Sequence, residues 1–387
     1  MEAYLDNAAT TSVFPEVRDI MNTLMEEDFG NPSSKHTKGM IAEKYINDAR
    51  DIICSQLKCD AREIVFTSGG TESNNMALIG AATANMRAGK HIITTRIEHP
   101  SVHEPLAYLE ELGFEVTYLP VNEKGQLEVD VLLNAIREDT ILISVMYVNN
   151  EVGSVLDVKA LCDAAKKKNP SVLFHVDAIQ GYGKYKIVPK KLGIDLMSVS
   201  GHKIHGPKGS GFIYIKNRTK IRPIIFGGGQ QKGMRSGTEN VPAIAGLGKA
   251  SEIIYTAHSE KIERLYELKK YFIDNINKIE DVTVNAVDTE DIKASAPHIV
   301  SVSFGNIRSE VMLHALAEKG VFVSSGSACS SNHPELSGTL KAIGVKNELL
   351  DSTLRFSFSV NTTKEEIDYA LAQVKEVLPA LRKFVRK

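Results

Sequence analysis

The chain has 387 residues, of which 43% are hydrophobic and 24% charged, enough to bury more than one hydrophobic core. Its net charge is −2 and its acidic and basic residues are mixed along the chain, which argues against nucleic acid as a direct ligand. No run of about 18 apolar residues occurs, and four cysteines are too few for a disulfide framework. We therefore expect a cytoplasmic protein with reduced thiols and no membrane attachment.

Apolar runs of strand length recur along the first part of the chain, and helical patterns separate most of them. In residues 101–113 and 158–169, leucine and alanine recur at spacings of three and four, which is typical of amphipathic helices. The alternation predicts an α/β layer with a largely parallel central sheet. We expect its strands at 91–97, 114–121, 141–148, 172–179, 196–200 and 211–215.

The pattern changes after about residue 248. A long charged amphipathic stretch, residues 251–279, leads into the strand-like runs VTVNAV, HIVSVSF, VFVSS and TLRFSFSV and a final helix from Lys364. This order predicts a second, smaller α+β domain. The expected organisation is an N-terminal segment that packs with the small domain, a large α/β domain and a small C-terminal domain, at residues 1–14, 15–248 and 249–387.

Polar residues follow several of the strand-like runs, where ligands of α/β sheets bind. In TSGGTESNN, residues 67–75, two glycines precede Thr71 at an expected helix start. Such a turn suits a phosphate group, or simply an ordinary N-cap. His99 follows the next run and would pack or cap a helix there. His99 and His103 together could bind a metal, but the local spacing supplies no third ligand, so we expect none.

Asp177 lies at the end of one further run, residues 172–179, and Lys203 follows another, residues 196–200. A carboxylate at the end of a buried strand is costly unless it meets a positive partner. Lys203 lies in SVSGHKIHGPKGSG, residues 198–211, and is either an ion-pair partner or an amine held for covalent chemistry. Together with a phosphate site, these residues predict pyridoxal phosphate. The phosphate would lie on the TSGGTES turn, the ring nitrogen on Asp177 and the aldehyde on Lys203.

Motifs along nearly the whole chain resemble the cysteine desulfurases, which are class V aminotransferase-like, fold-type I pyridoxal phosphate enzymes. The resemblance is to the long-loop branch that contains the housekeeping and nitrogen-fixation types. It implies a large domain with a mainly parallel central sheet and a smaller α+β C-terminal domain. The motifs are YLDNAATT, NPSS, FTSGGTESNN, EHPSV, NNEVG, HVDAIQ, SGHKIHGPKGSG, GGGQQKGMRSGTEN, SSGSACSS and RFSFS.

The resemblance also implies residue roles. Lys203 would bond to the cofactor, His99 would stack on its ring, and Asp177 and Gln180 would contact the ring nitrogen and the phenolic oxygen. The phosphate would be held by Thr71, Ser200 and His202, together with Thr238 from the second subunit of a homodimer. Asn150 and Arg355 would hold the substrate carboxylate, which suits the planar guanidinium group.

Cys329 distinguishes sulfur transfer from other uses of the same cofactor. A cysteine among small residues is by default a plain buried thiol, and we expect this of Cys54, Cys59 and Cys162. The Ser- and Gly-rich segment around Cys329 instead predicts an exposed loop, where a thiolate is a competent nucleophile. The resemblance implies that L-cysteine gives L-alanine and a persulfide on Cys329, with His99 moving protons nearby.

Other functions stay open at this point. A selenocysteine lyase or another class V enzyme would use the same site on a different β-substituent, and a non-catalytic sulfur carrier or regulatory protein would bind the cofactor without turnover. The resemblance implies sulfur-acceptor partners, either an iron–sulfur scaffold or a protein of a tRNA-thiolation or sulfur-relay pathway. Because the chain ends soon after its last expected helix, in LPALRKFVRK, we do not expect a scaffold to dock on a longer C-terminal segment.

Overall fold

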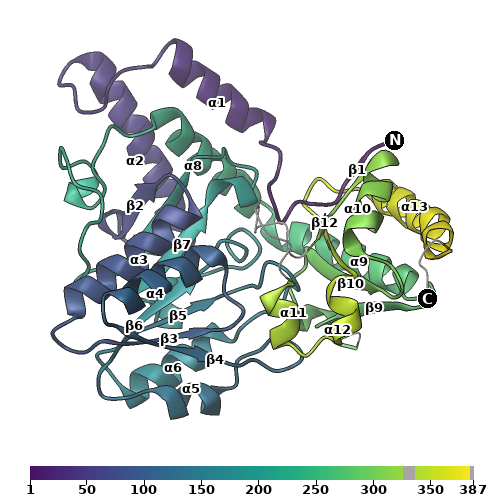
Figure 1. The fold of residues 1–387 in the computed structure, drawn as a ribbon. Helices are drawn as coiled ribbons and strands as arrows, with labels where there is room; N and C mark the ends of the chain where they lie inside the picture. The colour runs from purple at the N-terminus through teal and green to yellow at the C-terminus, as the bar shows by residue number, and fades with distance from the viewer. Residues whose placement is uncertain (289, 326–335, 384–387) are drawn as a thin grey trace.

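The computed structural model describes residues 1–288, 290–325 and 336–383, which form two lobes that lie side by side (Figure 1). The large lobe comprises the elements from α1 to α8 and is built on a seven-stranded sheet. The small lobe comprises the elements from α9 to α13 together with β1, and is built on a four-stranded sheet. Cys329 lies outside the described residues.

The sheet of the large lobe has the order β2-β8-β7-β6-β5-β3-β4. Strands β4, β3, β5, β6 and β7 are parallel, whereas β8 runs antiparallel to both β7 and β2. All six predicted strands form, and four of them end two residues before the predicted end. The bounds are Ile64–Thr67 for β2, His91–Thr95 for β3, Glu115–Leu119 for β4, Thr140–Met146 for β5, Leu173–Asp177 for β6, Leu196–Ser200 for β7 and Gly211–Ile215 for β8.

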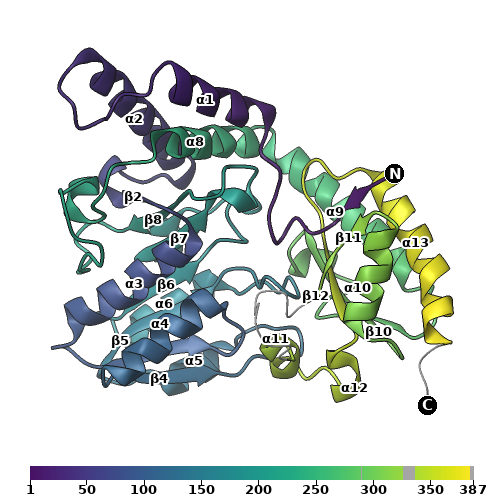
Figure 2. The same cartoon turned by 45° about the horizontal axis from the view of Figure 1, so that its top comes forward.

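Both faces of this sheet are buried, because successive side chains of a strand point to opposite faces. Ile92 and Leu142 pack with residues of α3 and α4, whereas Ile93 and Ile143 pack in the cluster that contains residues of α2, α6 and α8. Figures 1 and 2 show these helices around the sheet. The helices of the large lobe are α1 Pro15–Glu26, α2 Thr37–Leu57, α3 Gly70–Asn85, α4 Pro100–Glu111, α5 Val129–Ala135, α6 Val158–Lys168, α7 Pro189–Leu192 and α8 Val241–Tyr255.

The small lobe has its own sheet, with the order β12-β13-β10-β9 and antiparallel pairing throughout. Its helices surround a separate cluster of buried residues. The N-terminal strand β1 pairs with β11 in this lobe (Figure 2). Its elements are β1 Ala3–Tyr4, α9 His258–Ile276, β9 Val282–Asn285, β10 Ile299–Phe304, α10 Ser309–Glu318, β11 Val321–Phe322, β12 Ser324–Ser325, α11 Gly338–Ala342, α12 Asn347–Leu350, β13 Thr353–Ser357 and α13 Lys364–Arg382.

Two stretches that looked continuous in the sequence are divided in the structure. Residues 251–279 belong to two helices, α8 and α9, because Ala257 adopts a left-handed conformation with φ 50° that ends the helical path. The run VFVSS splits into β11 and β12, which pair with strands of two different sheets. Each lobe has its own sheet and its own buried clusters, whereas the division into domains at residues 1–14, 15–248 and 249–387 stays a prediction.

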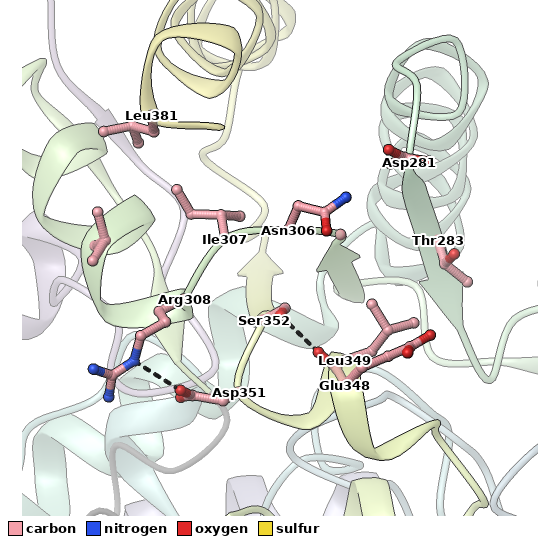
Figure 3. A pocket seen from close by; sticks show the side chains of 12 residues that line it. Asp281, Thr283, Asn306, Ile307, Arg308, Glu348, Leu349, Asp351, Ser352 and Leu381 are labelled. Atoms are coloured by element: carbon pink, nitrogen blue, oxygen red, sulfur yellow. Dashed lines mark hydrogen bonds and ion pairs between the residues drawn. The ribbon is translucent and has the colours of Figure 1, made fainter. Parts of the chain in front are cut away.

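A cavity of about 780 Å³ lies on the small lobe beside α12 and the end of α13 (Figure 3). Its rim carries Asp281, Glu348 and Asp351, and Arg308 Nε donates to Asp351 Oδ2 at 3.0 Å. None of the residues predicted to bind the cofactor or substrate lines it. No helix in the described ranges has an apolar stretch long enough to cross a membrane.

Replacing Phe272 by alanine should strongly destabilise the small lobe. Its side chain is fully buried and contacts the rings of Phe356 and Phe358, with centroids at 4.8 and 5.6 Å. Truncating such a side chain leaves a cavity, which costs about 3–5 kcal/mol. Urea unfolding monitored by circular dichroism measures the loss. The matched control is Phe226→Ala, because Phe226 is 81% exposed. Equal losses in the two variants would show that Phe272 is not part of a packed core.

Candidate functional site

A cavity of about 300 Å³ lies where β6 and β7 end, between the two lobes. It is lined by side chains from the large lobe, by the N-terminal segment at Ala8 and Ala9, and by β13 of the small lobe. The structure therefore brings together residues that are far apart in the sequence. The predicted site residues that line this cavity are Thr71, His99, Asn150, Asp177, Gln180, Ser200, His202, Lys203 and Arg355.

Asp177 is the last residue of β6 and is buried at the cavity. Its Oδ1 accepts a hydrogen bond from the Ile179 N–H at 2.9 Å, and its Oδ2 accepts one from Asn74 Nδ2 at 2.8 Å. Burial raises the pKa of Asp177, while these hydrogen bonds and the charges of His99 and Lys203 oppose the rise. The carboxylate is thus well placed to receive a cationic N–H group in the cavity.

His99 caps the N-terminus of α4 and lines the same cavity. The Ser101 N–H donates to Nδ1 at 3.1 Å, so the neutral imidazole carries its hydrogen on Nε2. Burial lowers the pKa of His99, which favours this neutral form. The Ser101 hydroxyl bridges His99 Nδ1 and Asn74 Nδ2, at 2.9 Å to each. A continuous chain of hydrogen bonds therefore runs from His99 to Asp177.

Lys203 follows β7 in a single turn of 3₁₀ helix, and its amine lies over the N-terminal segment. Nζ donates to the backbone carbonyls of Ala8 and Ala9, each at 2.6 Å. Lys184 is also buried here, and its Nζ donates to the Lys203 carbonyl at 3.1 Å. Burial, together with the charge of Lys203, lowers the pKa of Lys184 to about 8. The charge of Lys203 therefore disfavours the charged form of the nearby Lys184 amine.

The N-terminus of α3 forms one wall of the cavity. Gly70 is its first residue, and a Cβ atom at this position would lie 2.2 Å from Ile179 Cδ1. Thr71, Ser200 and His202 line the cavity beside this helix start. Burial lowers the pKa of His202 to about 4, so the ring is neutral near pH 7. Exposed helix N–H groups with hydroxyls nearby make this wall suitable for a phosphate group.

Arg355 comes from β13 of the small lobe and is 5% exposed. One terminal nitrogen donates to the Asn150 carbonyl at 2.7 Å, and the other pairs with Asp6 Oδ1 at 2.9 Å. Its Nε is buried and has no hydrogen-bond partner among the described residues. Such an arginine offers remaining N–H donors for an anion that enters the cavity.

Three polar residues at the site were missed by the sequence analysis. Asn74 and Glu98 are buried beside Asp177, and His298 Nε2 lies 3.1 Å from Gln180 Oε1. Because Gln180 Nε2 donates to the Ala8 carbonyl at 2.9 Å, both ends of its amide are fixed. Asn74 lies within the TSGGTESNN segment, and Glu98 directly precedes His99, so each had a signal in the sequence. His298 had none.

One predicted site residue that the structure describes, Thr238, does not line this cavity in the single chain. Thr238 is exposed and lines a different cavity, with Leu24 and Pro32. Cys329 is outside the described residues. The described flanks of its segment lie near the site, since Ser324 pairs opposite Arg355 and Ser337 Oγ hydrogen bonds to Glu151.

Pyridoxal phosphate fits the residues that line the cavity. A buried carboxylate for the ring nitrogen, an amine for the aldehyde and a helix N-terminus for the phosphate face one space. Asn74 Oδ1 is buried beside them without a hydrogen-bond partner among the described residues. The expected ring-stacking residue, His99, also borders the cavity. The residues that line the cavity therefore match the ring nitrogen, the aldehyde and the phosphate of the cofactor.

The chain matches known protein sequences over nearly its whole length. The profile of the family described as Aminotransferase class-V matches residues 3–370. A protein named cysteine desulfurase IscS from Dictyoglomus turgidum (strain DSM 6724 / Z-1310) is 45% identical over 382 residues, which are 98% of this chain and 95% of the relative. A protein of the same name from Methanosarcina thermophila is 44% identical over 379 residues, 98% of this chain and 92% of the relative.

Solved structures also share the fold of this chain. A structure titled "NIFS-LIKE PROTEIN" superposes with a TM-score of 0.93 at 37% sequence identity, covering 98% of this chain and 100% of that chain. A structure titled "SspA in complex with cysteine" superposes with a TM-score of 0.81 at 32% identity, covering 93% of this chain and 100% of that chain.

Glu98→Gln should change how stability depends on pH. Burial raises the pKa of Glu98 from 4.5 to about 8, so between these values the native state keeps a proton that the unfolded state loses. This group therefore lowers the unfolding free energy as pH rises, by about 1.4 kcal/mol per pH unit. The variant lacks this titration, so relative to wild type it should gain stability from pH 5 to 8 in urea unfolding.

The matched control for this prediction is Glu111→Gln, at the exposed end of the helix α4 that begins just after Glu98. Its unfolding free energy should follow the wild-type pH profile. Parallel profiles for wild type and Glu98→Gln would mean that Glu98 is already ionised in the native protein.

Proposed function

This chain belongs to the class-V aminotransferase family and, within it, to the cysteine desulfurases, and from the geometry of its cavity we propose how its residues perform that reaction. It is a pyridoxal-phosphate-dependent enzyme of fold-type I, as predicted from the sequence. The proposed reaction converts L-cysteine to L-alanine and leaves the sulfur as a persulfide on Cys329. The observation that carries the assignment of residues is the convergence of Asp177, Lys203 and Arg355 on one cavity.

We propose that three parts of the cavity hold the cofactor. Asp177 binds the ring nitrogen and Lys203 the aldehyde, while Thr71, Ser200 and His202 bind the phosphate. Gln180, whose amide is fixed by Ala8 and His298, donates to the phenolic oxygen. When bound, pyridoxal phosphate supplies a sink for the electron pair released at the α-carbon of an amino acid. Burial of Asp177 keeps water away from its contact with the ring nitrogen.

The substrate carboxylate is proposed to bind Arg355 and Asn150. Arg355 is held by the Asn150 carbonyl and by Asp6, so it presents its N–H groups without needing to reorganise. Lys203 Nζ then accepts the proton from the substrate α-carbon. His99, neutral and with its hydrogen on Nε2, is proposed to exchange a proton with the substrate sulfur or with the Cys329 thiol.

Cys329 is proposed to receive the sulfur. Its Sγ attacks the substrate sulfur, the bond between that sulfur and Cβ breaks, and Cβ takes a proton. The α-carbon then regains a proton from Lys203, which gives L-alanine. The described flanks support this assignment, because Ser324 lies opposite Arg355 in the β12–β13 pair. The outer sulfur of the Cys329 persulfide is then transferred to an acceptor protein. We propose an iron–sulfur scaffold or a sulfur-relay protein of thiolation as that acceptor, in the cytoplasm.

The decisive test follows the products of L-cysteine in the wild type and in Cys329→Ser. The wild type should form alanine and carry one added sulfur on the peptide that contains Cys329. The serine variant should keep its cofactor absorbance and its spectral response to L-cysteine, yet lose persulfide and most alanine, since a hydroxyl is a poor nucleophile toward sulfur. Chromatography of alanine and mass spectrometry of peptides measure both.

Two controls separate this proposal from its alternatives. Lys203→Ala should lose the visible absorbance of the bound cofactor, whereas Lys186→Ala, a change at an exposed lysine that does not line the cavity, should keep it. Normal alanine formation by Cys329→Ser would overturn the desulfurase mechanism. Turnover of L-selenocysteine without any need for Cys329 would favour a selenocysteine lyase.

We further propose a homodimer in which Thr238 completes the phosphate site of the partner subunit. Within one chain, Thr238 is exposed, lies in the segment between β8 and α8, and does not line the Lys203 cavity. Arg235 of the same segment pairs with Glu72 in the first turn of α3, with Nε and Oε1 at 2.9 Å. The segment is thus anchored beside the helix start that is proposed to hold phosphate.

Mixed dimers test this arrangement. Lys203→Ala and Thr238→Asp chains, carrying different tags, are expressed together and purified through both tags. If Thr238 acts across the interface, one site of each mixed dimer is intact, and about half of the wild-type activity per dimer should return. Each variant alone should be nearly inactive, since the first lacks the amine and the carboxylate introduced in the second repels the phosphate. Mixed dimers no more active than their parents, or a monomer with full activity, would exclude the proposal.

A further inference from the structure

The C-terminus of helix α2 brings two cysteines together. The helix ends at Leu57, and Lys58 has a left-handed conformation with φ 54°. The N–H groups of Lys58 and Cys59 both donate to the Cys54 carbonyl, the second at 3.2 Å. In a helix end of this type, the residue after the left-handed one packs its side chain against the residue five positions earlier. Here both of these positions are cysteines.

The two side chains also lie in one apolar region. Cys59 packs against the buried cluster that contains Cys54, and neither cysteine is in a disulfide. Cys54 is 8% exposed and Cys59 is half-buried, so solvent reaches the pair from the Cys59 side. Neither residue lines the Lys203 cavity.

The surroundings distinguish the two sulfurs. The neighbouring Cys59 thiol lowers the pKa of Cys54, to which the positive charge of Arg50 also contributes. Cys54 in turn raises the pKa of Cys59. Cys54 is therefore the sulfur that ionises first and the better nucleophile, while Cys59 is placed to react with it afterwards.

We propose that Cys54 and Cys59 form a redox site, separate from the Lys203 cavity, at which a peroxide produces a reversible intramolecular disulfide. The Cys54 thiolate attacks one peroxide oxygen, the O–O bond breaks, and hydroxide leaves, so that Cys54 becomes a sulfenic acid. The hydroxide takes the proton of Cys59. The Cys59 thiolate then attacks the Cys54 sulfur and displaces a second hydroxide. The two thiols lose two electrons and the peroxide gains them.

Cys162 provides a matched comparison within the same lobe. It is fully buried, and its Sγ donates to the Gly193 carbonyl at 3.0 Å. Burial raises the pKa of Cys162 to about 11. Its thiol is thus both protonated and shielded, which are the conditions under which oxidation is slow. The contrast makes the reaction selective for the pair at the end of α2.

The sequence around the pair permits a direct test. Trypsin cuts after Arg50, Lys58 and Arg62, so a disulfide between Cys54 and Cys59 holds together two peptides, residues 51–58 and 59–62. Holoenzyme is treated with hydrogen peroxide, its remaining thiols are alkylated, and non-reducing digests are analysed by mass spectrometry. The expected product is the linked pair of peptides, lighter by two hydrogen atoms than their sum. Dithiothreitol should release both, and Cys162 should stay fully alkylated.

Single variants assign the two roles. Cys59→Ser should leave a sulfenic acid on Cys54 that dimedone traps, whereas Cys54→Ser should oxidise at Cys59 at least about tenfold more slowly. The same digests of Cys329→Ser should still contain the linked peptides, because the reaction does not require the desulfurase nucleophile. Melting curves of the untreated variants verify that they are folded.

Three results would overturn the proposal. One is complete alkylation of both cysteines after peroxide treatment of folded wild type. Another is linkage of Cys54 to a cysteine other than Cys59. The third is oxidation of Cys162 as fast as that of Cys54, which would show that the pair has no special reactivity. None of these outcomes bears on alanine formation, so the redox site and the desulfurase function are tested separately.

Discussion

A carboxylate buried at the end of a central strand is the constraint around which the site is organised. Asp177 is stabilised by the backbone of its own turn and by Asn74, and the same asparagine reaches Ser101 and through it His99. Three elements, β6, α3 and α4, are thus tied to one another by polar contacts in an apolar interior, where an unsatisfied group is costly. A shift of either helix would leave the carboxylate poorly paired.

The site also depends on contacts between the two lobes. The N-terminal segment supplies the Ala8 and Ala9 carbonyls that receive Lys203 Nζ, and it supplies Asp6, which pairs with Arg355. Because β1 pairs with β11 in the small lobe, this segment fixes the position of β13 relative to β7. The Ala8 and Ala9 carbonyls accept hydrogen bonds from Lys203, and the Asp6 carboxylate accepts one from Arg355. These contacts orient the amine and the guanidinium before any ligand binds.

The sequence predicted which site residues lie at the ends of strands, but it did not predict which residues of different elements contact one another. Asp177, Ser200 and Lys203 lie at or just after strand ends that alternating apolar runs predict, since ligands of α/β sheets gather there. His298 could not be found, because its contact with Gln180 joins residues 118 positions apart and follows no local pattern. The division of the run VFVSS into two strands could not be predicted for a related reason. Its first part, β11, pairs with β1 and its second part, β12, with β13, and these partners come from opposite ends of the chain.

Burial also determines which charges the cavity retains. His99 and His202 are neutral because the surrounding protein disfavours their cationic forms, and burial likewise favours the protonated form of Glu98. With these groups uncharged, the ionisable side chains that remain along the cavity are Asp177, Lys203 and Arg355. Such a distribution favours a ligand that presents a cationic ring nitrogen to β6 and anionic groups elsewhere. Pyridoxal phosphate together with an amino acid carboxylate has that distribution of charge.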